Sequence, residues 1–385
     1  MKRNPFTPGL PIDPEHFIGR KQEIDIFKKS LTQSFFANPQ NLAIIGDRGI
    51  GKSSLLRKFE SIAEKKGCLV VRREVDASVN SLQTLSYFIL TAIKSEGNRF
   101  FSKPKKVKDK VSRFFKKYKV GIAVAGFGGS LEEKKPQIAV QEDFFNELSE
   151  ISENVGMDIP SIVIMLDEAE HLQSIDGAWG FIRSVFTRLL EKKHNYLIVV
   201  SGKLNLFKNI KEIFSPMERF FFPKEIGNLN KEETIEAIEK PLTENNVSIS
   251  NEVKNLFAEF TDGHPFVIQV FGYYLFELGE KTIDLGLFNE ELPRILDRLR
   301  VQVFQDRYYS ASPSEKKILD YMANSTKTVF RPTEIKKHFN FKNPRTLMSR
   351  LVKKDCLRKK GVGKYMLYHK LFKSYILNEN KKRGV

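Results

Sequence analysis

The chain has 385 residues, of which 41% are hydrophobic, so it is long enough to form two or three domains that each bury a core. Its two cysteines, Cys68 and Cys356, exclude a disulfide framework and a zinc site built from paired cysteines. The net charge of +17 is concentrated in residues 99–119 (+9) and 315–385 (+15), which leaves −7 on the rest and favours an anionic polymer or a membrane surface as partner.

The amino-terminal segment does not have the pattern of a secretory signal. Residues 1–14 contain two basic residues and four prolines but no apolar stretch. No window of the sequence supplies the roughly 18 uninterrupted apolar residues of a membrane span. Together with the sparse use of cysteine, these features lead us to expect a cytoplasmic protein.

Five apolar runs alternate with helical stretches in the first part of the chain. The first run, residues 41–45, is followed by a helix-compatible stretch at 52–65. Continuous runs of Val, Ile and Leu suit strands that are buried on both faces of a parallel sheet. The other four runs are residues 68–75, 162–166, 196–200 and 219–226. We therefore expect an α/β domain over residues 1–229.

The segment after the first predicted strand satisfies the pattern G-x-x-x-x-G-K-[ST], and it lies between a strand and a helix as the motif requires. It consists of Gly46, Asp47, Arg48, Gly49, Ile50, Gly51, Lys52 and Ser53. Glycines allow backbone N–H groups to surround phosphates. Lys52 would reach the β- and γ-phosphates of ATP, and Ser53 would coordinate Mg²⁺. The alternative is a chance match in a glycine-rich turn; the context favours an ATP site that extends to Ser54.

The third predicted strand, residues 162–166, is followed by the acidic pair Asp167 and Glu168. An aspartate at this place suits a ligand of Mg²⁺, and a glutamate suits the base that polarises the attacking water. Alternatively, the two acids only begin the next helix, because helix amino termini favour negative charge. A protein that merely binds nucleotide does not need the glutamate, so the two motifs together predict ATP hydrolysis.

Residues 97–141 interrupt the α/β pattern and are predicted to be an insertion. In the basic part, helical spacing places Val107, Val111, Phe114 and Phe115 on one face. Apolar alternation and glycines at 120–131 indicate a strand or hairpin. Such a basic helix can lie on anionic lipid, bind a partner, brace nucleic acid, or pack on the core with its lysines in solvent. The partner of the insertion stays unassigned.

The strand signals stop after residue 229. Residues 230–310 contain several helical stretches, including 265–280 and 292–309, and are predicted to form a helical lid. Residues 311–385 begin with three predicted helices, each opened by a proline near its start. Two predicted strands around Gly361 and Gly363 follow, and then a last helix. This order is the pattern of a winged-helix domain.

The third helix of the predicted winged helix, residues 343–355, is the expected recognition helix, with Leu347, Leu351 and Val352 facing inward. The predicted DNA contacts are the outward Arg345, Thr346, Ser349, Arg350 and Lys353, with Arg358, Lys359, Lys360 and Lys364 at the wing. Winged helices also bind proteins, which is the alternative. The local charge of +15 favours double-stranded DNA.

Several motifs together resemble the archaeal-type ATPases of the STAND group, relatives of the AAA+ origin-recognition initiators. They are Phe17-Ile18-Gly19-Arg20, NLAIIGDRGIGKSSLL, LDEAEHL and Gly263-His264-Pro265. The resemblance covers about residues 17–278 and implies an ASCE-type P-loop NTPase core with a helical lid, of which a winged helix is a frequent companion. Residues 265–280 lack the sensor 2 arginine of an AAA+ initiator, which favours the STAND side.

The resemblance implies roles for five further residues. Phe17 and Ile18 would lie near the adenine, and Pro265 would close over the nucleotide from the lid. Ser201 occupies the sensor 1 position, where a polar side chain touches the γ-phosphate or the water. Arg219 falls where many relatives carry an arginine finger for a neighbouring subunit, so the chain would associate with itself. The alternatives are a strand-capping serine and an ordinary surface arginine.

These features predict an ATP-hydrolysing molecular switch of the STAND/AAA+ type that binds double-stranded DNA through its winged helix. One alternative is a signalling or defence ATPase whose winged helix mediates autoinhibition or protein contacts. A second is an ATPase that resembles the initiators of replication or of mobile elements. All three use ATP and Mg²⁺.

Overall fold

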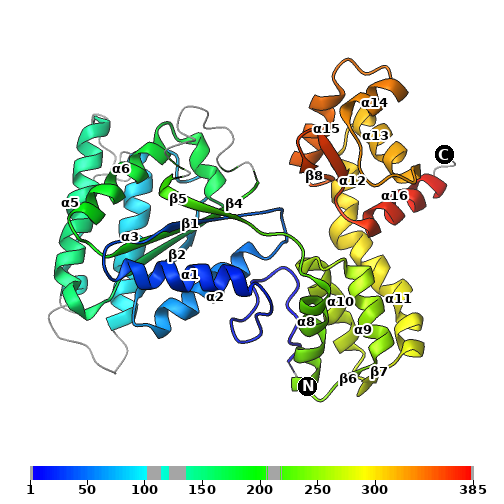
Figure 1. Ribbon diagram of the computed structural model, residues 1–385, viewed down its shortest axis with the longest axis horizontal. Coiled ribbons are helices and arrows are strands. Elements are labelled where there is room, and N and C mark those ends of the chain that lie inside the picture. The colour runs from blue at the N-terminus through cyan, green and yellow to red at the C-terminus, as the bar shows by residue number, and fades with distance from the viewer. Residues whose placement is uncertain are drawn as a thin grey trace. The chain divides into compact units, whose positions relative to one another are not determined.

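The computed structural model describes residues 3–101, 114–120, 136–204, 206, 217 and 219–382 (Figure 1). The chain divides into two compact units. One unit contains residues 11–46 and 51–226, and we call it the sheet unit. The other contains residues 1–10, 47–50 and 227–385, and we call it the helical unit. The turn of the glycine-rich segment, residues 47–50, thus belongs to the helical unit.

The sheet unit contains one five-stranded sheet, in which every pair of neighbouring strands is parallel. Its strands are β1 (Asn41–Ile45), β2 (Leu69–Glu74), β3 (Ile162–Asp167), β4 (Tyr196–Gly202) and β5 (Phe221–Glu225), in the order β2-β3-β4-β1-β5. The five predicted runs are therefore strands. Their ends differ: β4 continues through Gly202 because it still pairs with β1 there, and β5 begins at Phe221, after Arg219.

Helix α1 (Lys21–Ser34) precedes the first strand of this sheet, and further helices lie along the chain between β1 and β4. These are α2 (Lys52–Lys65), α3 (Leu82–Phe101), α5 (Gln137–Val155) and α6 (Ala178–Glu191), with the short 3₁₀ helices η1 (Gly156–Asp158) and η2 (Ala169–Ser174). Alternate strand residues pack with α3, α5 and α6 in one large apolar cluster. The intervening residues, such as Leu42 and Val163, are also buried, and α1 and α2 contact the strands there. Burial on both faces explains the unbroken apolar runs of the sequence.

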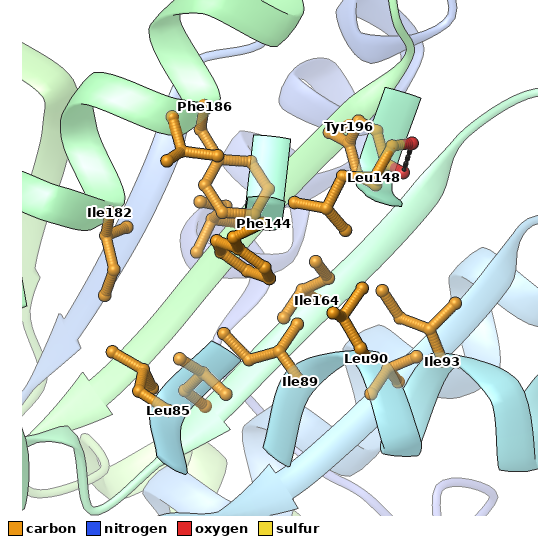
Figure 2. Packing of buried hydrophobic residues seen from close by; sticks show 14 of the residues in the cluster. Leu85, Ile89, Leu90, Ile93, Phe144, Leu148, Ile164, Ile182, Phe186 and Tyr196 are labelled. Atoms are coloured by element: carbon orange, nitrogen blue, oxygen red, sulfur yellow. Dashed lines mark hydrogen bonds between the residues drawn. The ribbon is translucent and has the colours of Figure 1, made fainter. Parts of the chain in front are cut away.

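The apolar cluster on the α3, α5 and α6 side is built largely from aromatic and branched side chains (Figure 2). Phe144 stacks on Phe181 with ring centroids 5.5 Å apart, and Phe186 meets Tyr196 edge to face. The hydroxyl of the fully buried Tyr196 donates a hydrogen bond to the Leu148 carbonyl oxygen at 2.7 Å, as the dashed line in Figure 2 marks. The one polar atom that this ring brings into the core is thereby satisfied.

The described part of the predicted insertion packs on this core. Helix α3 continues through Phe101, so the first residues assigned to the insertion are an ordinary part of that helix. Phe115 and Tyr118 are buried in the cluster, and a Cβ atom on Gly97 would lie 2.5 Å from the Phe115 ring. Lys116, Lys117 and Lys119 are exposed. Here the basic segment has an apolar face on the core and lysines in solvent; Val107, Val111 and residues 121–131 lie outside the described residues.

The helical unit begins with five helices. They are α8 (Lys231–Glu244), α9 (Asn251–Thr261), α10 (Pro265–Glu277), α11 (Leu285–Leu299) and α12 (Asp306–Ser310), with the π-helical turn η3 (Arg300–Gln305) before α12 and a small parallel pair, β6 (Ser248–Ile249) and β7 (Thr282–Ile283). The predicted start of the helix at 292 is wrong. Asp284 caps α11 by accepting the Leu287 N–H at 2.9 Å, and Pro293 is tolerated inside the helix.

The end of the chain contains the predicted sequence of three helices, a hairpin and a helix. Its elements are α13 (Pro313–Asn324), α14 (Pro332–His338), α15 (Pro344–Lys353), the antiparallel pair β8 (Leu357–Gly361) and β9 (Lys364–Leu367), and α16 (Lys370–Lys382). We call residues 312–382 the helix–hairpin region. Ser312 and Glu315 form a capping box at the start of α13, as the Ser-Pro start of this helix indicated. None of the described helices is long and apolar enough to cross a membrane.

Two buried histidines, His264 and His369, lie within the helical unit. The Leu371 N–H donates to Nδ1 of His369 at 3.1 Å, so Nε2 carries the proton and donates to the Thr261 carbonyl oxygen at 2.9 Å. Both nitrogens of the neutral ring are thus in use. Burial lowers the pKa of His369 to about 4, and it lowers the pKa of His264 well below its ordinary value.

We expect the helical unit to lose stability as the pH falls from about 6.5 to 4. In that window the unfolded chain binds a proton at His369 that the folded chain does not bind, so the free energy of unfolding falls by about 1.4 kcal/mol per pH unit for this site. The stability is fully present above pH 6.5. His369→Gln keeps an N–H donor toward Thr261 and removes the titration. Urea unfolding followed across this window should show a shallower pH dependence for the variant; identical slopes would contradict the assignment.

Candidate active site

The glycine-rich segment forms a tight turn between β1 and α2. Gly49 and Gly51 have φ values of 77° and 92°, which residues with a side chain adopt only at a cost. Gly51 is the N-cap of α2, and Lys52 is the first residue of this helix. The Gly46 N–H donates to the Gly202 carbonyl oxygen at 3.1 Å, and Nζ of Lys52 donates to the Gly46 carbonyl oxygen at 3.0 Å. The amino end of α2 is therefore presented at the carboxyl end of β1.

The sheet order brings the predicted acid and sensor residues together beside this turn. Strand β4 lies between β3 and β1, so the carboxyl ends of these three strands are adjacent. Asp167, the last residue of β3, is buried, and the hydroxyl of the fully buried Ser201 donates a hydrogen bond to its Oδ1. Asp167 and Ser201 are thus partners, and Gly202 next to Ser201 holds the start of the glycine-rich turn.

Glu168 has an unusual backbone conformation. Its φ of 50° and ψ of 37° are left-handed, a conformation that costs energy in a non-glycine residue and is found mainly at functional sites. Its N–H donates to Asp167 Oδ1 at 3.0 Å. Its side chain is half exposed, and Oε2 lies 3.7 Å from Nε2 of His171. His171 follows Glu168 by three residues, which puts the two side chains on one side of a 3₁₀ turn.

The donor groups at this edge of the sheet suit Mg²⁺. The ion prefers oxygen ligands, and proteins usually supply only one or two carboxylates, with phosphates and water completing the shell. The Asp167 carboxylate and the Ser53 hydroxyl are ligands of this type, and one of the two Asp167 oxygens is taken by Ser201 and the Glu168 N–H. Among the described residues there is no cluster of three His, Cys, Asp or Glu side chains that would favour a different metal site.

Residues 11–18 of the sheet unit run beside α2. The Ile12 N–H donates to the Ser54 hydroxyl at 3.1 Å, and the Arg57 side chain donates to the Pro11 carbonyl oxygen at 2.8 Å. The Ser54 side chain therefore faces the chain rather than open solvent. Phe17 and Ile18 follow this segment and are only half buried, so each has apolar surface available for a base.

Within the helical unit, the turn at residues 47–50 contacts two other segments. The Phe266 N–H donates to the Gly49 carbonyl oxygen at 3.2 Å, which places Pro265, the first residue of α10, next to the turn. The Tyr368 hydroxyl donates to the Arg48 carbonyl oxygen at 3.4 Å and also bonds to Nε2 of His264. The Gly-His-Pro element and the residue after β9 are thus both at the turn.

Arg219 is exposed and lies just before β5. Strand β5 begins beside Asn41, the first residue of β1, so Arg219 is at the opposite end of the sheet from the turn that follows β1. It therefore does not join Lys52 and Asp167 in one site of the same chain. The position is compatible with the predicted role toward another chain and with an ordinary surface arginine.

The predicted DNA-binding residues lie largely on exposed surface. In α15 the buried residues are Pro344, Met348 and Leu351, with Leu347 and Val352 half buried. Exposed residues are Arg345, Thr346, Arg350, Lys353, Lys359, Lys360 and Lys364, whereas Ser349 is half buried. Arg358 is half buried, and its guanidinium lies 3.6 Å from the Asp262 carboxylate, in the loop after α9; its contact with DNA stays a prediction.

Comparison with known proteins agrees with this geometry. Residues 16–200 match the family model of the AAA ATPase domain, and no curated protein is significantly similar in sequence. The Walker-type ATPase PABY2304 of Pyrococcus abyssi is similar in structure, with a TM-score of 0.62, 17% identity and coverage of 94% of this chain and 97% of that one. The ORC2 protein of Aeropyrum pernix, solved in ADPNP–ADP complexes, is also similar in structure, with a TM-score of 0.56 and 14% identity. The match covers 95% of this chain and 94% of that one. At these identities the likeness concerns the fold, and it confirms the predicted α/β P-loop NTPase.

Proposed function

We propose that the chain hydrolyses ATP with Mg²⁺ and uses the cycle to switch its binding to double-stranded DNA. The match of residues 16–200 to the family model of the AAA ATPase domain supports this proposal. The observation that carries the proposal is the meeting of Gly46, Asp167 and Ser201 at adjacent strand ends. A phosphate-binding turn, a ligand for the metal and a polar sensor are what phosphoryl transfer requires, because its catalysis consists mainly of positioning and charge stabilisation.

Each residue has a distinct task in the proposed reaction. Lys52, at the start of α2, turns from the Gly46 carbonyl oxygen to the β- and γ-phosphates. Ser53 and Asp167 hold Mg²⁺, which neutralises charge on the phosphates when bound. Glu168 polarises the attacking water, and its exposed carboxylate leaves room for that water. Ser201, fixed by Asp167, orients the water or the γ-phosphate.

The nucleotide is also held by groups outside the strand ends. Phe17 and Ile18 supply apolar surface for the adenine, and Pro265 approaches from α10. Arg219, which lies away from its own site, serves a neighbouring copy of the chain as an arginine finger. An assembled form would therefore hydrolyse ATP faster than the single chain.

The partner in this proposal is duplex DNA, bound by the helix–hairpin region acting as a winged helix. The support is electrostatic, since residues 315–385 carry +15 and the outward residues of α15 include Arg345, Arg350 and Lys353. Arginines near the amino end of a helix are suited to the edges of guanine, and lysines to phosphates.

Duplex binding should be measured by fluorescence anisotropy over a range of salt concentrations. We expect affinity to fall steeply with salt, and Arg345→Ala to weaken binding by about 1–3 kcal/mol, roughly tenfold or more, with relaxed sequence preference. Arg298→Ala, which removes an exposed arginine of α11, is the matched control and should bind as the wild type does. No binding at low salt would end the DNA half of the proposal.

A second function is favoured by one contact. The Tyr368 hydroxyl, directly after the hairpin, donates to the Arg48 carbonyl oxygen in the phosphate-binding turn. In an autoinhibited signalling or defence switch, this contact would hold the turn until a protein ligand released it. Tyr368→Phe would then raise the ATPase rate, and duplex DNA would leave it unchanged. A rate that responds to duplex DNA but not to Tyr368→Phe favours the first function.

A further inference from the structure

A groove of about 550 Å³ opens between the start of α14 and the hairpin. Phe330 pairs with Tyr365 of β9 in both backbone directions, and both side chains are buried. Because side chains alternate along an extended chain, the flanking Arg331 and Lys364 face away from that core. The described residues that line the groove are Val329, Arg331, Thr333, Glu334, Lys360 and Lys364.

Three segments of the chain therefore bring three cations to one concavity. Arg331 precedes α14, Lys360 is in β8 and Lys364 opens β9. All three are exposed, and among the described residues none of them forms an ion pair. Like charges gathered in this way repel one another, so an anion that neutralises them binds favourably.

The single carboxylate in the groove, Glu334, offsets only part of the charge of Arg331. Oε1 of Glu334 accepts from Nζ of Lys327 at 2.8 Å, and Oε2 accepts from the Arg331 N–H at 2.7 Å. The ion pair with Lys327 holds the pKa of Glu334 below its ordinary value, so the group stays ionised and engaged with these donors. Arg331, Lys360 and Lys364 keep their charges for another partner.

We infer that this groove binds one backbone phosphate of duplex DNA and thereby fixes the position of the helix–hairpin region on the duplex. The inference rests on the proposed DNA binding. A phosphate oxygen accepts hydrogen bonds from guanidinium, ammonium and hydroxyl groups, and the groove offers the first two from its cations and the third from Thr333. None of its described lining residues is aromatic, so it has no surface on which a base would stack.

A phosphate contact differs from a base contact in two measurable ways. Removing it weakens binding equally for unrelated duplex sequences, and it lowers the slope of log K against log salt concentration by about 1. We therefore expect Arg331→Ala and Lys364→Ala, each tested in the full chain, to bind two unrelated duplexes with equally reduced affinity. The slope should be smaller by up to about 1, because the remaining cations still contact the same phosphate. Lys360→Ala provides a third variant on an exposed strand residue. Lys364→Arg keeps the charge and should keep the slope.

The matched control is Lys381→Ala, which removes an exposed lysine at the end of α16, outside the groove. If Arg331→Ala, Lys360→Ala and Lys364→Ala keep the slope of this control while the wild type binds duplex DNA in a salt-dependent manner, the groove inference is overturned and the proposed function stands. If the wild type binds no duplex at low salt, both fall. Circular dichroism of each variant confirms that α14 and the hairpin are folded.

Discussion

Replacing Glu168 by glutamine should lower the rate of ATP hydrolysis by about two to four orders of magnitude, because it removes the group that we propose polarises the attacking water. Glutamine keeps the size and the hydrogen-bonding shape of the side chain but cannot accept the proton. The left-handed backbone at this residue is unaffected by the change, so the fold of the strand end is retained. ATP binding should persist, since the phosphates contact the turn at residues 46–53 and not Glu168.

Two controls make this result specific. Lys52→Ala should lose ATP affinity as well as turnover, because Lys52 is the cation proposed to reach the phosphates. His171→Ala tests whether the neighbour of Glu168 at 3.7 Å matters, and it should leave ATP affinity unchanged. Turnover is measured as phosphate release, and affinity with a fluorescent ATP analogue. Wild-type turnover in both Glu168→Gln and Lys52→Ala would remove the catalytic assignment.

The parts of the site that adjoin one another in the sequence could be predicted from it. The turn at residues 46–53 has a motif whose glycines are required by the backbone, and Gly49 and Gly51 do have positive φ. Asp167 ends a strand, as its place after an apolar run indicated. By contrast, the bond between Ser201 and Asp167 depends on β4 lying next to β3, and strand order is not visible in the periodicity of a sequence.

The features that the sequence did not predict have two kinds of physical cause. Arg358 was predicted to contact DNA from beside the wing turn, and its ion pair with Asp262 could not be predicted because that residue lies far away in the sequence. The helix predicted to begin at residue 292 begins earlier, as α11, because Asp284 caps it. In α15 the pattern of leucines missed Met348, which is fully buried. Tertiary contacts decided the cases of Arg358 and Met348, whereas a local cap decided the start of α11.

Duplex affinity should depend on the bound nucleotide, and this dependence is the second large effect expected. The turn at residues 47–50 belongs to the same compact unit as the helix–hairpin region, and Tyr368 bonds to Arg48 within it. Phosphates bound at this turn would add new contacts to the helical unit, which also contains the helix–hairpin region. Coupling of this kind is typically worth about 1–3 kcal/mol, or roughly 5–150-fold in affinity.

The most direct test of the switch is the duplex affinity of the Glu168→Gln chain measured with ATP and with ADP at one fixed salt concentration. Glutamine at this position keeps ATP intact during the measurement. The account predicts at least about a fivefold difference between the two nucleotides, and by linkage the same factor in ATP affinity with and without duplex. Equal duplex affinity in the two nucleotide states would contradict it.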